Sequence, residues 1–242
     1  MLRPLSLLSV LVLAAASPAV AVDTLQVTSP DPVTESWRWT RFDRGNGLAS
    51  GVCAILQDRN GHVWIGTDPG GVQRYDGYHW TTYTMRDGLG SNDANSLLEG
   101  QDGAIWLSTI GGGINRFDGR TWTNFGVEDG LTSPRTWPTG LAQAFDGTVW
   151  AGHTGSRSDT TGTWSGISRF SGEAWASVAG PEELPRPRVL SACGTADGSM
   201  WFTTFDGPVL RLNGSNWSRY TSQDGLAGPF AGILTRTRDG VL

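Results

Sequence analysis

The three histidines of this 242-residue chain are the side chains best suited to acid–base or metal chemistry at neutral pH. His62, His79 and His153 do not share a spacing that would bring metal ligands together. All 18 Lys+Arg residues are arginines, which excludes Schiff-base and lysine-nucleophile chemistry. Nucleophile elbows, P-loops and glycine-rich dinucleotide fingerprints are not found. The sequence therefore predicts no catalytic residue, no metal site and no cofactor.

A second set of residues, in the third quarter of the chain, is suited to binding rather than catalysis. It comprises Trp137, Trp164, Arg135, His153, Arg157 and Asp159. Exposed aromatic rings next to polar groups stack well on sugar rings and other flat ligands. Two interpretations of the two tryptophans stay open: they contact a ligand, or they pack an inserted loop onto the fold.

The elements that position these residues come from an internal repeat. A Trp follows a short glycine turn four times, at Trp64, Trp106, Trp150 and Trp201, which are 42, 44 and 51 residues apart. A fifth copy begins at 240–242, where the sequence ends. Repeats of about 40–50 residues built from short strands and glycine turns are typical of β-propellers, in which each repeat forms one four-stranded sheet.

The predicted fold is an all-β propeller of four-stranded antiparallel blades, with four complete blades and a partial fifth in an incomplete ring. Each repeat holds an inner strand, a strand containing the Trp, a third strand with a repeated Arg, and an outer strand that begins with Trp. The Arg is expected to form hydrogen bonds between blades, and Pro138 is expected to weaken the inner strand of blade 3. The blades are predicted at about 50–83, 92–125, 136–178 and 187–220, with the partial blade at 229–242.

Loop lengths predict which end of the blades binds a ligand. The connections from the second to the third strand and from one blade to the next emerge on the same face. Nearly all length variation falls there, including an insert around 152–162 in blade 3. Variable insertions on one face of a repeat protein mark its binding face, and Trp137 and Trp164 both fall in these loops.

The N-terminus is predicted to be an export signal. An apolar run and a small-residue cleavage site indicate a signal peptide at 1–21, followed by a linker at 22–36 and the partial propeller at 37–242. A buried N-terminal helix is the alternative. The expected location is the periplasm or the extracellular space.

Charge and cysteine content add two expectations. The net charge of −5 disfavours a nucleic-acid partner. Cys53 and Cys193 occupy different positions in blades three repeats apart, so two buried free thiols are expected rather than a disulfide, although export makes a disulfide conceivable.

Four segments of the second repeat resemble the two-component regulator propeller repeat. They are Gly-Leu-Gly-Ser-Asn at 88–92, Ile-Trp-Leu-Ser-Thr at 105–109, Gly-Gly-Ile-Asn-Arg-Phe-Asp-Gly at 112–119 and Trp-Thr-Asn-Phe at 122–125. The resemblance extends over about 37–242. It implies an extracytoplasmic sensor, often preceding a transmembrane helix and a histidine kinase or diguanylate cyclase, and several relatives are thought to sense carbohydrates or other nutrients.

The function expected from these observations is a non-catalytic, ligand-sensing propeller of a two-component or related signalling system. No kinase or cyclase motif occurs in this chain. The alternatives are a propeller enzyme, such as a streptogramin-lyase-like enzyme or a glycan hydrolase, and a scaffold for protein partners. A carbohydrate or another small nutrient is the expected ligand. Membrane attachment is expected only through a missing downstream segment, and oligomerisation through open blade faces.

Overall fold

The computed structural model describes residues 40–49, 51–154, 165–182, 187–205, 207–228 and 232–235. Apart from Thr40 and Arg41, these residues belong to one compact unit, Phe42–Leu242. The unit consists of antiparallel strands joined by tight turns and short 3-10 helices. The predicted all-β fold with four-stranded antiparallel blades is therefore confirmed.

Each blade pairs its four strands in the order in which they occur in the sequence. Blade 1 contains β1 (Gly51–Gln57), β2 (Val63–Asp68), β3 (Gly71–Tyr75) and β4 (Trp80–Tyr83). Blade 2 contains β5 (Ala94–Glu99), β6 (Ile105–Thr109), β7 (Ile114–Phe117) and β8 (Trp122–Phe125). Blade 3 contains β9 (Thr136–Gln143), β10 (Val149–Thr154), β11 (Ser165–Phe170) and β12 (Trp175–Val178). Blade 4 contains β13 (Val189–Gly194), β14 (Met200–Thr204), β15 (Val209–Asn213) and β16 (Asn216–Tyr220).

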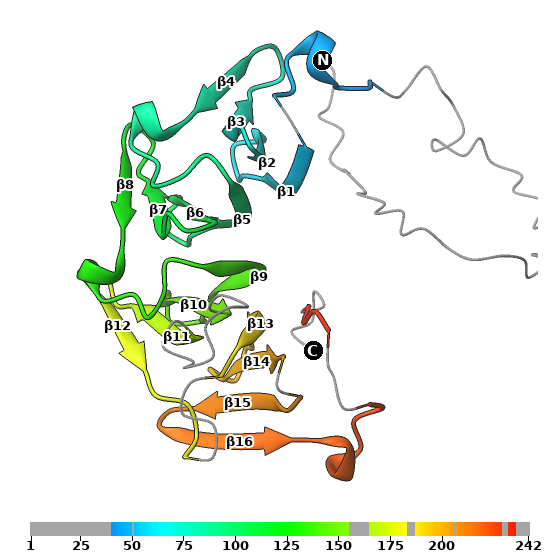
Figure 1. Ribbon diagram of the computed structural model, residues 1–242, viewed down its shortest axis with the longest axis vertical. Helices are drawn as coiled ribbons and strands as arrows, with labels where there is room; N and C mark the ends of the chain where they lie inside the picture. The colour runs from blue at the N-terminus through cyan, green and yellow to red at the C-terminus, as the bar shows by residue number, and fades with distance from the viewer. Residues whose placement is uncertain are drawn as a thin grey trace, which may run out of the picture. The chain divides into compact units, whose positions relative to one another are not determined.

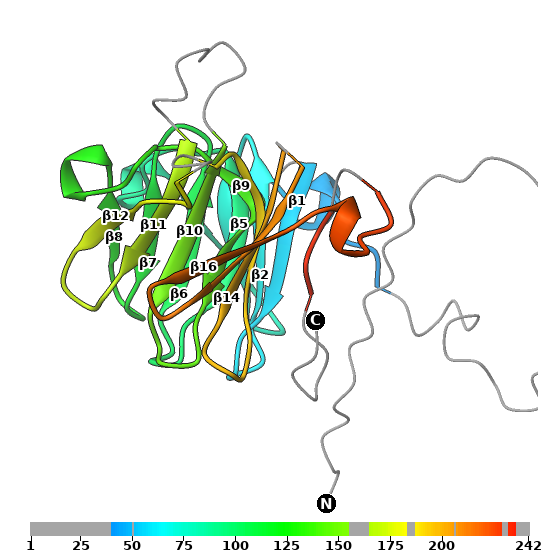
Figure 2. The same ribbon diagram turned by 90° about the horizontal axis from the view of Figure 1, so that it is seen from below.

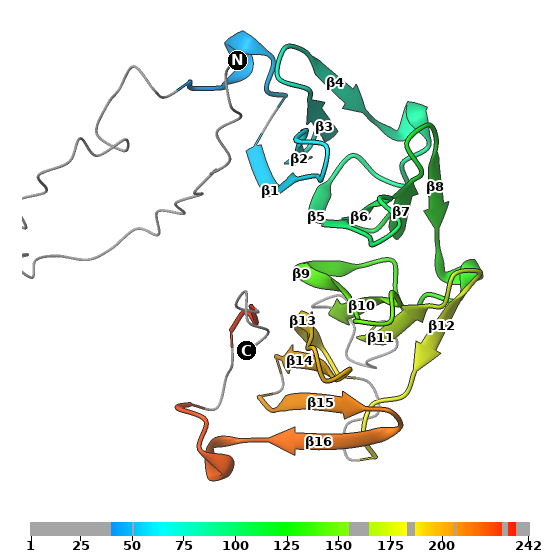
Figure 3. The same cartoon turned by 180° about the vertical axis from the view of Figure 1, so that it is seen from behind.

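Within this unit the blades follow one another around a common inner side. The first strands of the blades (β1, β5, β9 and β13) line that side, and the last strands (β4, β8, β12 and β16) lie outside (Figure 1). The opposite view shows the same order (Figure 3). Seen from the side, the strands of neighbouring blades stand next to one another, with their turns at the two ends (Figure 2).

Glycine pairs at the start of the third strand allow the blade to curve tightly. Gly71 and Gly113 have φ angles of +78° and +74°, which only glycine adopts readily. A Cβ on either residue would collide with the backbone carbonyl of Tyr83 or Phe125 in the adjacent outer strand. These close approaches explain why glycine recurs at this point of the repeat.

Aromatic packing between neighbouring blades forms the core. Trp64 of blade 1 packs edge-on against Phe117 and Trp122 of blade 2, at 5.6 Å and 6.2 Å between ring centroids. One blade further on, Trp106 packs edge-on against Phe170 and Trp175, at 5.0 Å and 5.8 Å. Trp64 and Trp106 are therefore buried wedges between neighbouring blades.

Two features of the fold differ from the simple repeat. Thr139 in β9 forms a single parallel pair with Ser191 in β13, so the inner strands of blades 3 and 4 are joined to each other as well as to their own blades. Every blade has a register shift between its first and second strands, and the irregular segment is longest in β9, where 136–141 lies opposite 151–153 and contains Pro138.

Residues before blade 1 and after blade 4 pack against these two blades. Phe42 contacts Tyr75 and Trp80 at 5.2 Å and 5.4 Å, much as Tyr83 contacts the corresponding residues of blade 2. Residues 232–235 lie against blade 4, where Leu234 N donates to Ser191 Oγ at 3.1 Å, but they form no strand. Most of the predicted partial blade, the predicted signal peptide and the linker lie outside the described residues.

Candidate functional site

An aromatic and cationic cluster lies where blades 3 and 4 meet, at the end that the sequence predicts to bind a ligand. Trp137, the second residue of β9, is 42% exposed. Its ring packs edge-on against Phe205, with centroids 5.4 Å apart. The Arg188 guanidinium lies over the other ring of this pair, 4.9 Å from the centroid of Phe205. We call this end of the blades the loop face.

Arg135 lies directly before β9 on the same face. It forms an isolated antiparallel bridge with Ile110, and its backbone N–H donates to Ser133 Oγ at 3.1 Å. Its side chain is exposed. Arg135 and Trp137 are therefore neighbours on an accessible surface, in agreement with their position in the sequence.

His153 is fully buried in β10. Its Nε2 is 2.9 Å from Ser168 Oγ, and its Nδ1 is 3.2 Å from the Arg135 carbonyl oxygen and 3.4 Å from Thr136 Oγ1. Burial lowers the pKa of His153 to about 4, because the charged imidazolium loses its hydration. The structure therefore places a neutral, hydrogen-bonded imidazole beneath the loop face, where it supports the segment that carries Arg135.

The other three residues of the predicted site are Arg157, Asp159 and Trp164, and all of them lie outside the described residues. Trp137, Arg135 and the buried His153 are the predicted site residues that the structure brings together. Phe205 and Arg188 join them, although neither is among the predicted site residues. Phe205 follows β14 in the loop position that varies among the repeats, which is the signal that could have identified it.

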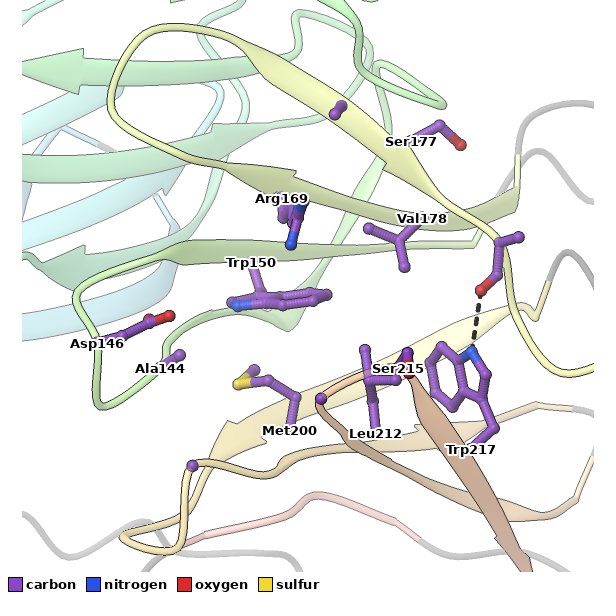
Figure 4. Close-up of a pocket in the computed structure, with 14 residues that line it drawn as sticks. Ala144, Asp146, Trp150, Arg169, Ser177, Val178, Met200, Leu212, Ser215 and Trp217 are labelled. Carbon is purple, nitrogen blue, oxygen red and sulfur yellow. Dashed lines mark hydrogen bonds between the residues drawn. The ribbon is translucent and has the colours of Figure 1, made fainter.

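A groove of about 530 Å³ lies between blades 3 and 4, away from the loop face. Trp150 and Arg169 of blade 3 face Leu212 and Trp217 of blade 4 across it (Figure 4). The Trp217 indole N–H donates to the Ala179 carbonyl at 3.1 Å. No pattern in the sequence predicts this groove.

Two of the repeated arginines, Arg116 and Arg211, pair within their own blades rather than between blades, so the expectation of inter-blade hydrogen bonds is wrong for these two. Arg116 Nη2 is 2.7 Å from Asp102 Oδ2, and Arg211 Nη2 is 2.7 Å from Asp197 Oδ2. In each pair the arginine stands opposite the Trp of its own blade in the adjacent strand, and the aspartate lies in the turn before that Trp. The register of the hairpin therefore favours pairing within one blade. Hydrogen bonds from Thr195, Ser199 and Arg211 lower the pKa of Asp197 strongly.

Cys53 is exposed on β1, so the buried position expected for it is wrong. Residual burial and the nearby carboxylates of Asp68 and Asp93 raise the pKa of its thiol. Cys193 is partly buried in β13. No group of three or more His, Cys, Asp or Glu side chains is arranged to hold a metal ion in the part of the chain that the structure describes. A helix of the length and apolarity needed to span a bilayer is not found among the same residues.

Comparisons with known proteins bear on two features of the chain, the family resemblance of one repeat and the fold. Residues 46–68, which include β1 and β2, match the family described as two component regulator propeller. No curated protein sequence matches the chain.

Three solved structures illustrate the likeness of fold. One is the extracellular domain of a protein described as a hybrid two-component system from B. thetaiotaomicron, with a TM-score of 0.66, 19% identity, and a match over 84% of this chain and 27% of that one. A second such domain from the same organism has a TM-score of 0.59, 18% identity, and a match over 76% and 25% of the two chains. Virginiamycin B lyase from Staphylococcus aureus has a TM-score of 0.53 and 17% identity, over 70% and 55%.

The chain thus spans about a quarter of the length of the two extracellular domains, and at these identities the likeness concerns the fold. The resemblance seen in the sequence is confirmed by the family match at 46–68. The chain has a β-propeller fold, and its residues 46–68 match the two component regulator propeller family.

Proposed function

We propose that this protein is an extracytoplasmic ligand-sensing propeller of a two-component or related signalling system, with no catalytic role for this chain. The observation that carries the proposal is the match of residues 46–68 to the two-component regulator propeller. Extracellular domains of two proteins described as hybrid two-component systems have the same fold. Export through the N-terminal segment 1–21 belongs to the same proposal.

The proposed ligand site is the loop face around Trp137, Phe205, Arg188 and Arg135. Trp137 offers an exposed ring, Arg188 lies over its partner ring Phe205, and the exposed Arg135 stands two residues before Trp137. Aromatic rings and donors on one surface suit a carbohydrate or a similar polar ring. The ligand would thus contact the junction of two blades, where its binding is sensitive to how those blades are held together.

An enzyme related in function to the propeller lyases receives less support. The likeness to virginiamycin B lyase is one of fold, at 17% identity. His153, the histidine that the sequence places nearest to the loop face, is fully buried and engaged at both ring nitrogens. General acid–base catalysis requires a group within hydrogen-bond reach of the substrate, and His153 does not reach solvent.

A screen of the purified protein against glycan fragments and small nutrients tests the proposed function. We expect saturable binding of one ligand class by calorimetry, with no consumption of that ligand on prolonged incubation. Turnover of a bound compound would instead establish an enzyme. Binding of a protein partner with no response to any small molecule would establish a scaffold.

Replacing Trp137 with Ala is expected to weaken the binding of the ligand found in that screen by about 1–3 kcal/mol, because a stacked aromatic anchor is lost. The melting temperature should change little, since Trp137 is 42% exposed. Tyr78→Ala is the matched control: Tyr78 is 86% exposed in the turn between β3 and β4, and its loss should leave affinity unchanged. A Trp137→Ala protein that unfolds, with normal affinity for its folded fraction, would show that Trp137 is a packing residue.

A further inference from the structure

The groove between blades 3 and 4 arises from a change in the repeat. The third strand ends in Phe117 in blade 2 and in Phe170 in blade 3, and each ring fills the space next to the Trp of the preceding blade. Blade 4 has Leu212 at this position. The smaller side chain leaves a groove of about 530 Å³ beside Trp150, whereas the corresponding space beside Trp106 is about 300 Å³.

Arg169 differs from its counterparts in the neighbouring blades. It stands opposite Trp150 in the β10–β11 pair, as Arg116 stands opposite Trp106. Arg116 is bonded to Asp102 and lies over Trp106, 5.7 Å from the ring centroid. Arg169 makes neither contact within the described part of the chain, and its guanidinium borders the groove instead (Figure 4).

The turn aspartate of blade 3 is held by the backbone instead. Asp146 Oδ1 accepts a hydrogen bond from Thr148 N at 2.9 Å, and Asp146 lines the same groove as Arg169. The groove thus offers a guanidinium whose five donors suit a carboxylate, and a separate carboxylate that can accept from a hydroxyl group.

The ring of Trp150 forms one wall of the groove. Its indole nitrogen is buried without a hydrogen-bond partner, like those of Trp80, Trp122 and Trp175, so this nitrogen does not distinguish the groove from the other seams. Leu212, Met200 and Val178 supply an apolar wall for the body of a ligand.

We propose that this groove binds a ring-bearing carboxylic acid, with its carboxylate on Arg169 and its ring against the apolar wall of blade 4. The site is distinct from the loop face, because Trp137 does not line it. Sugar acids and aromatic acids share this chemistry. Asp146 would accept hydroxyl groups of a sugar acid, and it would repel the carboxylate of either ligand if that group lay at its end of the groove.

The test is a titration of the purified protein with D-glucuronate, benzoate and D-glucose, followed by the indole N–H signals in ¹H–¹⁵N NMR spectra. The Trp150 signal is assigned from its loss in Trp150→Phe. We expect saturable shifts of the Trp150 and Trp217 signals with at least one acid and none with glucose. Saturable shifts with glucuronate alone identify a sugar-acid site, and saturable shifts with benzoate alone identify an aromatic-acid site.

Three variants decide the role of Arg169. Arg169→Gln should lower the affinity for the acid about tenfold or more, as expected for loss of a charged hydrogen-bond donor. Asp146→Asn should strengthen the binding of benzoate, because a like charge is removed and benzoate has no hydroxyl group for Asp146 to hold. Arg116→Gln, the matched arginine that is paired with Asp102, should leave affinity unchanged.

The proposal is overturned if neither acid shifts the Trp150 signal, if glucose shifts it equally, or if Arg169→Gln binds as well as the unmodified protein while its other indole signals show a native fold. Trp137→Ala separates this site from the proposed function. Binding in the groove should survive that change, whereas binding at the loop face should not.

Discussion

Replacing Trp106 with Ala is expected to lower the free energy of unfolding by about 3–5 kcal/mol, among the largest effects of any single substitution in this chain. Trp106 is 2% exposed and contacts aromatic rings of its own blade and of blade 3, among them Phe125 and Phe170. The residues around it come from several strands of two sheets, so they cannot collapse together to fill the space. The measurement is chemical denaturation followed by circular dichroism.

Tyr78→Ala is again the control, because an exposed side chain in a turn should alter stability by less than about 0.5 kcal/mol. A loss of less than about 1 kcal/mol for Trp106→Ala would contradict the packing described for the seam between blades 2 and 3. If Trp106→Ala does not fold, Trp106→Phe offers a milder version of the same comparison, and its loss should still exceed that of the control.

Acidification from pH 6.5 to pH 4 is expected to destabilise the protein by about 3 kcal/mol through His153 alone. The pKa of His153 is lowered to about 4 in the folded protein by burial, whereas an unfolded chain has an ordinary pKa near 6.5. The unfolded state therefore binds more protons in this interval. The contribution of His153 is fully present above about pH 6.5, and it is lost as the pH falls towards 4.

Denaturation curves at intervals of half a pH unit measure this effect, and His153→Gln should flatten the profile between pH 4 and 6.5. His79→Gln is the matched control, because the His79 side chain is 84% exposed and its replacement should leave the profile unchanged. Should His153→Gln fail to fold, NMR titration of the imidazole in the unmodified protein decides the matter. A His153 that titrates near pH 6.5 while the protein is folded would refute the prediction.

The fold was largely predictable because its main determinant is periodic. A tryptophan recurs after a glycine turn in each blade, and it is always the second residue of the second strand: Trp64, Trp106, Trp150 and Trp201. A periodic pattern fixes local elements and their neighbours, since every blade packs on the next in the same way. The parallel contact between Thr139 and Ser191 was not predictable, because Thr139 lies in the long irregular segment 136–141 of β9, which no repeat position records.

The candidate site was predictable only in part. Trp137 fell outside the repeat, and that exception identified it as a surface aromatic residue. His153 was misleading as a sequence signal, because its position near a loop suggests exposure, while in the structure it is fully buried and its ring is 2.9 Å from Ser168 Oγ in the next strand. Arg169 could not be singled out at all: the same arginine occurs in every blade, and only three-dimensional contacts separate a paired guanidinium from an unpaired one.

The two edges of the seam between blades 3 and 4 differ in how firmly they are joined. At the inner edge the parallel pair and the hydrogen bond from Thr139 Oγ1 to the Leu190 carbonyl, 2.8 Å long, fasten β9 to β13. Trp150 still packs on Phe202 of blade 4, with ring centroids 6.0 Å apart, but further out the groove next to Leu212 replaces the packing that a third-strand phenylalanine provides in the other seams. We expect a seam that is joined at one edge and open at the other to admit a change of tilt between its two blades. A molecule wedged into its open side would set the tilt of blade 4, and with it the spacing of Trp137 and Phe205 at the far end of the same seam.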